Sequence, residues 1–79
     1  MTNREKFNQA FIEVFAVEES ALTADFAKEN VDSWDSVHQL NIIAILEETF
    51  DIMMDPEDIM ELTSYEKGMA IMAKYDVEL

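Results

Sequence analysis

Apolar residues recur through most of this chain at three- and four-residue spacing, which is the spacing of one face of an α-helix. Thr2 and Glu5 match a capping box, so a helix is predicted to begin near Asn3. The apolar positions that follow should form its buried stripe. They are Phe7, Ala10, Phe11, Val14 and Phe15.

The strongest helical pattern covers residues 36–50. Ser36 and Gln39 match the spacing of a second capping box, which predicts Ser36 as the N-cap residue. We therefore expect a helix from about Ser36 to Phe50 with a broad apolar face. The residues of that face are Leu40, Ile43, Leu46 and Phe50, with Ile42 and Ile45 widening it.

Two further helices are predicted after residue 54. Asp55 can cap a helix whose first turn holds Pro56, and this short helix should run to about Glu61. Thr63 and Glu66 match a third capping box, which predicts Thr63 as the next N-cap. The inner face of the last helix should contain Tyr65, Met69, Met72 and Ala73.

Residues 16–35 break the helical period and are predicted to form a long linker. Because the chain has only one Gly and one Pro, it lacks the turn residues that hairpins need, and no strand is expected. The pattern predicts an all-α fold, a bundle of three main helices plus one short helix, in a single domain over residues 1–79. The linker should be anchored to it by Leu22, Phe26, Val31 and Trp34.

Acidic residues dominate the charge, with 18 Asp and Glu against 5 Lys and Arg. No Lys or Arg lies between Lys28 and Lys67, while acids are frequent there. Such a surface repels nucleic-acid phosphates and anionic membranes, so an electrostatic partner should be basic. No segment is apolar enough for a membrane span or a signal peptide. We expect a monomeric cytoplasmic protein that binds no nucleic acid and inserts into no membrane.

Ser36 is the candidate nucleophile, but its surroundings do not indicate a hydrolase. There is no Gly-x-Ser-x-Gly turn, and His38 lies only two residues away, where helix geometry points it to a different side. Since no second catalytic group is placed by spacing, His38 is interpreted as an exposed polar residue or a partner contact. No catalytic residue is predicted.

A metal site is not predicted either. The chain has no cysteine, which leaves it without thiolate ligands and without a thiol of its own. The acids at positions 51, 55, 57, 58 and 61 lack the central Gly of a calcium loop, and Pro56 begins a helix instead.

Residues 34–50 read WDSVHQLNIIAILEETF. Asp35-Ser36 at the head of a helix, followed at the family's spacing by Leu-Glu-Glu-x-Phe at residues 46–50, resembles the signature around the phosphopantetheine serine of acyl carrier proteins. The resemblance continues through the short helix to Thr63-Ser64 and covers essentially the whole chain. Length, helix order and acidity agree with it.

The resemblance implies a carrier protein rather than an enzyme. Ser36 would be esterified by 4′-phosphopantetheine from coenzyme A, with Asp35 beside the attachment point, and the arm's thiol would hold acyl groups as thioesters. As the predicted cap, Ser36 should contribute about 1 kcal/mol to stability, so Ser36→Ala should cost little and yet abolish loading.

The resemblance also implies a partner surface on the helix over residues 36–50. Asp35, Glu47 and Glu48 would contact basic patches on the phosphopantetheinyl transferase and on acyl-handling enzymes. Val37 and Ala44 would add a small apolar contact.

Some residues depart from carriers of bulk fatty acid synthesis. Trp34, His38 and Asn41 give residues 34–41 a character similar to free-standing carriers of specialised acyl, polyketide or amino-acyl pathways. The alternative function is an unmodified acidic helical interaction module whose Ser36 is only a helix cap. Several methionines either fill gaps in the core or line a core that opens around an acyl chain: Met53, Met54, Met60, Met69 and Met72.

Overall fold

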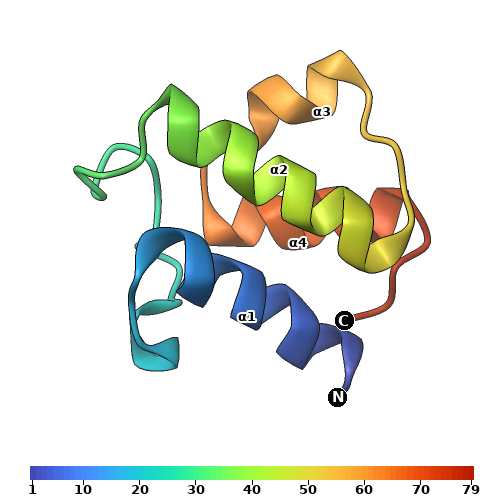
Figure 1. Cartoon of the computed structure of the whole chain (residues 1–79), viewed down its shortest axis with the longest axis horizontal. Coiled ribbons are helices and arrows are strands. Elements are labelled where there is room, and N and C mark those ends of the chain that lie inside the picture. The colour runs from blue at the N-terminus through green and yellow to red at the C-terminus, as the bar shows by residue number, and fades with distance from the viewer.

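Four α-helices and one short 3₁₀ helix make up the computed structural model, which describes residues 1–79 (Figure 1). The elements are α1 (Asn3–Phe15), η1 (Glu19–Ala21), α2 (Ser36–Phe50), α3 (Pro56–Glu61) and α4 (Tyr65–Lys74). No strand is present, which confirms the predicted all-α bundle of three longer helices and one short one. In Figure 1, α1 and α2 run in opposite directions, α4 lies behind α2, and α3 crosses above them.

The first helix is built as its sequence predicts. The Thr2 hydroxyl accepts a hydrogen bond from the Glu5 backbone N–H at 3.1 Å, and the Glu5 carboxylate accepts one from the Thr2 N–H at 2.9 Å. This reciprocal capping box satisfies two donors that a helix start otherwise leaves unpaired. The predicted stripe faces the core, with Val14 half-buried and the others buried: Phe7, Ala10, Phe11 and Phe15.

The bounds of α2 also match the prediction, and its predicted inner face is confirmed except at Leu40: Ile42, Ile43 and Leu46 are buried, and Ile45 and Phe50 are half-buried. Leu40 was expected in the core and is 64% exposed. The inward position on the first turn is held instead by Gln39, whose amide satisfies polar groups of the linker and of α3. The buried residues of α2 follow from Gln39 at helical spacing and are Ile42, Ile43 and Leu46.

Two N-cap predictions are wrong by one residue. The cap of α2 is Asp35 and not Ser36, and the cap of α4 is Ser64 and not Thr63. Each true cap has extended backbone angles, and its side chain accepts from the N–H three residues on. In both cases two neighbouring residues have side chains suited to capping, so spacing alone could not choose between them.

The inner face of α4 includes the chain's only glycine. Tyr65, Gly68, Ile71 and Met72 are buried, and Met69 is half-buried, while Ala73 is exposed, contrary to its predicted place on this face. A Cβ at position 68 would lie 2.9 Å from the ring of Phe7 and 3.1 Å from Leu62. Glycine is therefore needed here for the close approach of α1 to α4.

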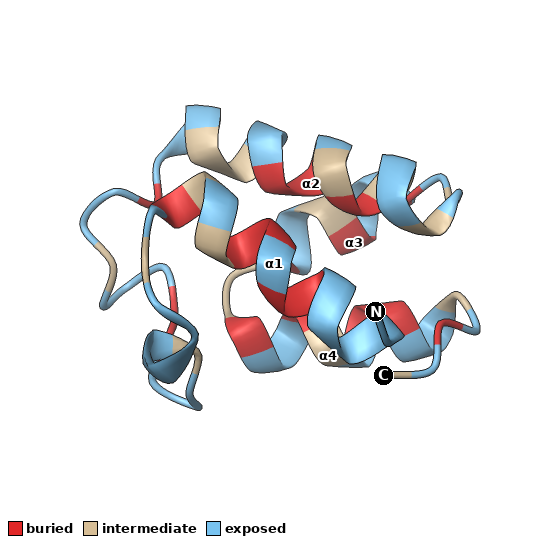
Figure 2. Cartoon of the chain, turned by 60° about the horizontal axis from the view of Figure 1, so that its bottom comes forward, coloured by how far each residue is buried: buried red, intermediate tan, exposed pale blue.

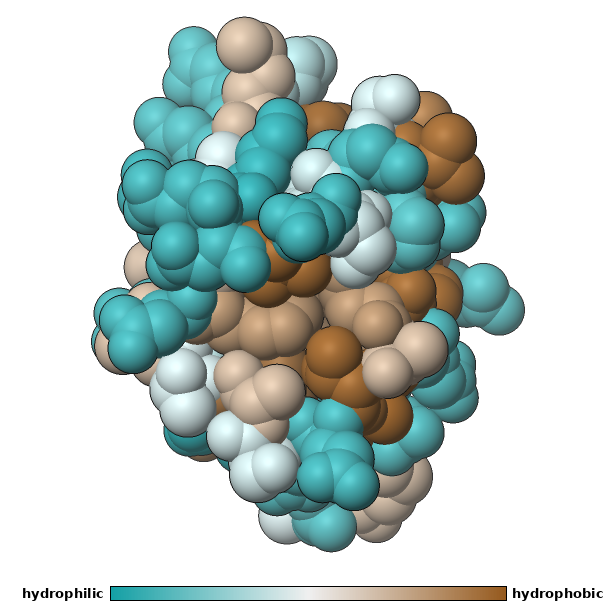
Figure 3. Space-filling view, turned by 90° about the vertical axis from the view of Figure 1, so that its left-hand side faces the viewer, coloured by the Kyte–Doolittle hydropathy of each residue, from teal (hydrophilic) through white to brown (hydrophobic).

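The linker over residues 16–35 is anchored by the residues predicted for that role. Trp34 and Phe26 are buried, and Leu22 and Val31 are half-buried against the core. Figure 2 shows short buried and half-buried stretches along this otherwise exposed linker. The Trp34 ring packs on those of Phe15 and Phe26, at centroid distances of 4.8 and 5.9 Å. Figure 3 views this end of the molecule, where apolar side chains lie recessed between polar ones.

The methionines divide between core and surface. Met54 and Met72 are buried and Met69 is half-buried, in agreement with a gap-filling role. Met53 and Met60 are 84% and 80% exposed, so neither is a core residue.

None of the helices combines the length and the apolar composition that crossing a membrane requires.

Candidate functional site

Ser36 is an exposed residue at the first position of α2. Because the neighbouring Asp35 caps the helix, the Ser36 hydroxyl is not used by the fold and makes no hydrogen bond within the chain. A hydroxyl in this position is accessible to a modifying enzyme. An anionic group attached to it would lie at the positive end of the α2 dipole, beside backbone N–H groups of the first turn.

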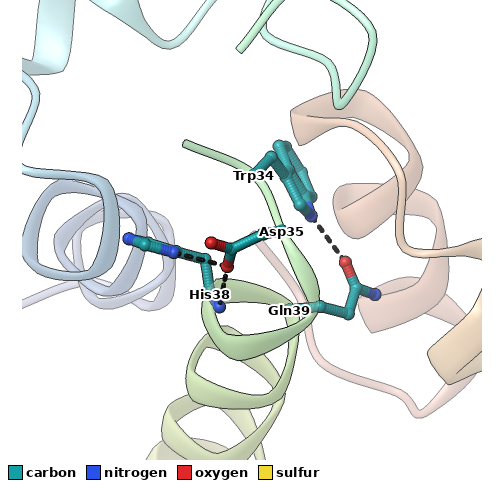
Figure 4. Close-up of polar contacts among 4 residues, drawn as sticks. All are labelled: Trp34, Asp35, His38 and Gln39. Carbon is teal, nitrogen blue, oxygen red and sulfur yellow. Dashed lines mark hydrogen bonds and ion pairs between the residues drawn. The ribbon is translucent and has the colours of Figure 1, made fainter. Parts of the chain in front are cut away.

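Asp35 holds the start of α2 and also contacts an imidazole. Its Oδ1 accepts from the His38 backbone N–H at 2.9 Å and lies 2.8 Å from the His38 Nδ1 (Figure 4). The backbone N–H of His38, and after it the imidazole, lower the pKa of the Asp35 carboxyl. This carboxylate is therefore ionised at neutral pH and places a negative charge next to Ser36.

His38 lies differently from its expected exposed position. Its ring is half-buried and stacks on Phe15 of α1, with a centroid distance of 5.7 Å and an interplanar angle of 21°. The ring nitrogen Nδ1 faces Asp35, on the side of α2 that turns toward α1 (Figure 4). His38 therefore joins the first turn of α2 to α1 and holds the Asp35 carboxylate in place.

Gln39 fixes the residues on the other side of Ser36. The indole N–H of Trp34 donates to the Gln39 Oε1 (Figure 4). The Gln39 Nε2 donates to the backbone oxygens of Ile59 at 2.8 Å and Leu62 at 2.9 Å. Sequence reasoning missed this role and used Gln39 only as a capping-box partner. Gln39 lies three residues before Ile42, the first buried residue of α2. This helical spacing indicates that Gln39 also faces inward.

An apolar strip runs along the outer face of α2. Val37 is 61% exposed and Leu40 64% exposed, and Ala44 continues the line one turn further on. We call these three residues the α2 strip. Exposed large apolar side chains that follow one helix face are typical of a protein contact. The predicted contacts Val37 and Ala44 thus lie together, and Leu40, missed by the sequence reasoning, lies between them.

The two predicted acids Glu47 and Glu48 lie near the far end of α2. At 1.5 Å per residue they are about 17 and 18 Å along the helix from Ser36. Glu48 is exposed and open to a partner. Glu47 is half-buried, and its Oε2 accepts from the Met54 N–H at 2.9 Å, so it already holds the segment that leads to α3.

Nowhere in the chain do three His, Asp or Glu side chains gather in a way that could hold a metal ion. Asp58, one of the acids weighed for a calcium loop, is buried and pairs with Lys74 and Tyr75. The acids of residues 51–61 thus include one that stabilises the fold.

No protein-family model matches this sequence, and no curated protein matches it.

Proposed function

We propose that this chain is an acyl carrier protein that holds acyl groups as thioesters on a 4′-phosphopantetheine arm attached to Ser36. The observation that supports it most is the division of roles between adjacent residues. Asp35 caps α2, while Ser36 presents an exposed hydroxyl that forms no bond within the chain. Esterification of Ser36 would therefore disturb no contact that holds the fold.

The residues around Ser36 fit a phosphodiester. The first turn of α2 offers backbone N–H groups and the positive end of the helix dipole, both of which favour an anion. The arm supplies the thiol that forms the thioester, which a chain without cysteine cannot provide. Two pairs of side chains hold the turn around Ser36. Asp35 bonds His38 on one side, and Trp34 bonds Gln39 on the other.

The partners of such a carrier would dock on α2. The α2 strip offers an apolar contact, and Asp35 and Glu48 provide negative charges near its two ends. With a net charge of −13 and no Lys or Arg on α2, the surface favours the phosphopantetheinyl transferase and acyl-handling enzymes with basic patches. Because Glu47 already bonds Met54, we expect a smaller part for Glu47 than for Glu48.

The acyl groups would belong to fatty acid synthesis or to a specialised acyl, polyketide or amino-acyl pathway. The specialised pathways are favoured because the first turns of α2 are less acidic than in carriers of bulk fatty acid synthesis. His38 and Asn41 leave the first two turns of α2 without an acidic side chain inside the helix.

Transfer from a fluorescent coenzyme A derivative by a broad-specificity phosphopantetheinyl transferase tests the proposal. Wild-type chain should become labelled, and Ser36→Ala should not. Ser33→Ala is the matched control, because Ser33 is an exposed serine three residues earlier in the linker, and this variant should label normally. Equal labelling of the Ser36→Ala variant would reject Ser36 as the attachment point.

An unmodified interaction module is the second candidate function. The exposed α2 strip favours it, since an apolar helix face can bind a partner without any prosthetic group. In that case no transferase would label the chain, and a basic partner protein would bind it equally well before and after incubation with coenzyme A.

A further inference from the structure

α3 is held in the fold mainly by polar bonds from its neighbours. It has six residues, which is too short for a helix to be stable by itself. Its only buried residue is the charged Asp58, while Ile59 is half-buried and Met60 is 80% exposed. Apolar burial therefore contributes little along α3 itself, and bonds to α2 and α4 determine where it lies.

The bonds on the α4 side meet at Asp58. Its Oδ1 accepts from the Lys74 Nζ at 2.9 Å, and its Oδ2 accepts from the Tyr75 hydroxyl at 2.6 Å. The Tyr75 oxygen in turn accepts from the Asp55 backbone N–H at 2.7 Å, at the start of α3. The C-terminal end of α4 thus holds α3 at its start and at its third residue.

The bonds on the α2 side meet at Gln39. Its Nε2 donates to the oxygens of Ile59, in the last turn of α3, and of Leu62, the C-cap residue, where a helix leaves carbonyl groups without intrahelical partners. The orientation of the amide is determined by its partners. The Trp34 indole can only donate and the two carbonyls can only accept, so Oε1 must face Trp34 and Nε2 must face α3.

Apolar side chains do not fill the space between α2 and α3 beside Gln39. A shallow hollow of about 270 Å³ lies against Gln39 and is lined also by Lys28, Ile59, Met60 and Thr63. With open space beside it, the amide of Gln39 is a main link between the first turn of α2 and the end of α3.

We propose that Gln39 is a positioning residue that couples the position of α3 to the turn carrying Ser36. One side chain bonds both the end of α3 and Trp34, which precedes Ser36 by two residues. Loosening α3 frees the Gln39 amide and with it the Trp34 ring, although α3 itself does not contact Ser36 through any hydrogen bond. This coupling does not depend on the carrier function.

The test loosens α3 from the side away from Gln39 and observes Trp34. Asp58→Asn weakens the bonds to Lys74 and Tyr75, and Trp34 is the only tryptophan, so its fluorescence reports on one site. Hydrogen exchange of the Ile59 and Leu62 amides, which bond within α3, should become about tenfold faster. Trp34 emission should shift to longer wavelength, with stronger quenching by acrylamide.

The coupling is then removed with Gln39→Met, which keeps the length of the side chain and loses its polar atoms. In this background Asp58→Asn should still accelerate exchange in α3 and should no longer shift the Trp34 emission further. Asp55→Asn is the matched control: Asp55 is exposed at the start of α3, its side chain makes no capping bond, and neither signal should change. Slow hydrogen exchange of the α1 amides verifies that each variant is folded. If Asp58→Asn does not fold, Tyr75→Phe replaces it.

Three results would overturn the proposal. Unchanged exchange in α3 would show that Asp58 does not hold it. Faster exchange without a change in Trp34 would show that α3 moves independently of the Ser36 turn. An equal Trp34 shift with and without Gln39 would show that another path connects the two.

Discussion

The Asp35 carboxylate accepts a hydrogen bond from the backbone N–H of His38 at 2.9 Å, and it thereby caps the helix whose first residue is Ser36. Had Ser36 been the cap, its hydroxyl would have been occupied by the fold. Because the neighbouring residue does this work, the serine is free for chemistry. The two side chains at the start of α2 therefore have separate roles, one in stability and one in the proposed attachment.

This separation predicts different stabilities for two alanine variants. Ser36→Ala should change the free energy of unfolding by about 0.5 kcal/mol or less, because it removes no bond within the chain. Asp35→Ala removes the cap and should lower the melting temperature by several degrees. Thermal unfolding followed by circular dichroism measures both.

Asp35→Asn is the control for the cap, since asparagine caps helices well without a charge. It should retain most of the stability that Asp35→Ala loses. If Ser36→Ala proves as destabilising as Asp35→Ala, the assignment of the cap is wrong.

We expect the protein to lose stability in acid as the buried Asp58 carboxylate becomes protonated. The Tyr75 hydroxyl, and after it the Lys74 ammonium, lower the pKa of the Asp58 carboxyl below its ordinary value of 3.8. A group whose pKa is lower in the folded state stabilises the fold above the unfolded pKa, and this contribution is lost as the pH falls through the folded pKa. The free energy of unfolding in urea should therefore fall below about pH 4.

Asp58→Asn should be less stable than wild type at pH 7 and should show a shallower decline in acid. Part of the decline should remain, because the pKa values of Glu5 and Asp35 are also lowered by their capping bonds. Parallel stability curves for wild type and Asp58→Asn between pH 5 and the acid limit would contradict this role.

Gly68→Ala should destabilise the protein even though alanine is the better helix former. The added Cβ would lie 2.9 Å from the tip of the Phe7 ring, which is fully buried and cannot move aside cheaply. Overpacking of this kind costs about 1–3 kcal/mol, and the gain in helix propensity offsets about 1 kcal/mol of it. Urea unfolding should show a net loss of about 1 kcal/mol.

Ala70, an exposed residue of the same helix, provides the comparison. Ala70→Gly should lower stability by about 1 kcal/mol through propensity alone. A stabilising effect of Gly68→Ala would show that α1 and α4 are not as close as the structure places them.

A substitution at Leu40 can show whether this residue serves to dock a partner or to stabilise the core. As an exposed residue of the α2 strip, it should tolerate Leu40→Ala with a stability change of about 0.5 kcal/mol, whereas the buried Ile43→Ala should cost about 2–5 kcal/mol. If partners dock on the strip, kcat/KM for loading by the transferase should fall about tenfold in Leu40→Ala. Unchanged loading kinetics together with unchanged stability would remove Leu40 from the partner surface.

The helices could be predicted from the sequence because their signals are local. The capping box of Thr2 and Glu5, the Pro56 first turn and the aromatic stripe of α1 depend only on residues within a few positions of one another. The linker anchors Phe26 and Trp34 were predicted for a similar reason, since large apolar residues in a polar segment need a core to pack on.

The wrong predictions concern features that depend on residues distant in the sequence, or on which of two neighbouring residues caps a helix. Gln39 replaces Leu40 on the inner face because Trp34 and the end of α3 are near it in space. Asp58 is buried because Lys74 and Tyr75 return to it from α4. Asp35 and Ser36 are both good caps, and only backbone angles decide between them.

The candidate site was predictable in part. The sequence and its resemblance to carrier proteins predict five site residues that are all exposed on or next to α2: Asp35, Ser36, Val37, Ala44 and Glu48. Glu47 could not be separated from Glu48 by sequence, because its bond to Met54 depends on the turn that follows the helix.

Mass spectrometry after incubation with coenzyme A and a phosphopantetheinyl transferase tests whether Ser36 carries a phosphopantetheine arm. We predict that the intact chain gains the mass of one arm, that fragmentation locates it on Ser36, and that Ser36→Ala gains nothing while remaining folded. An unchanged mass of the wild-type chain with several transferases, or an arm located on another serine, would contradict this prediction.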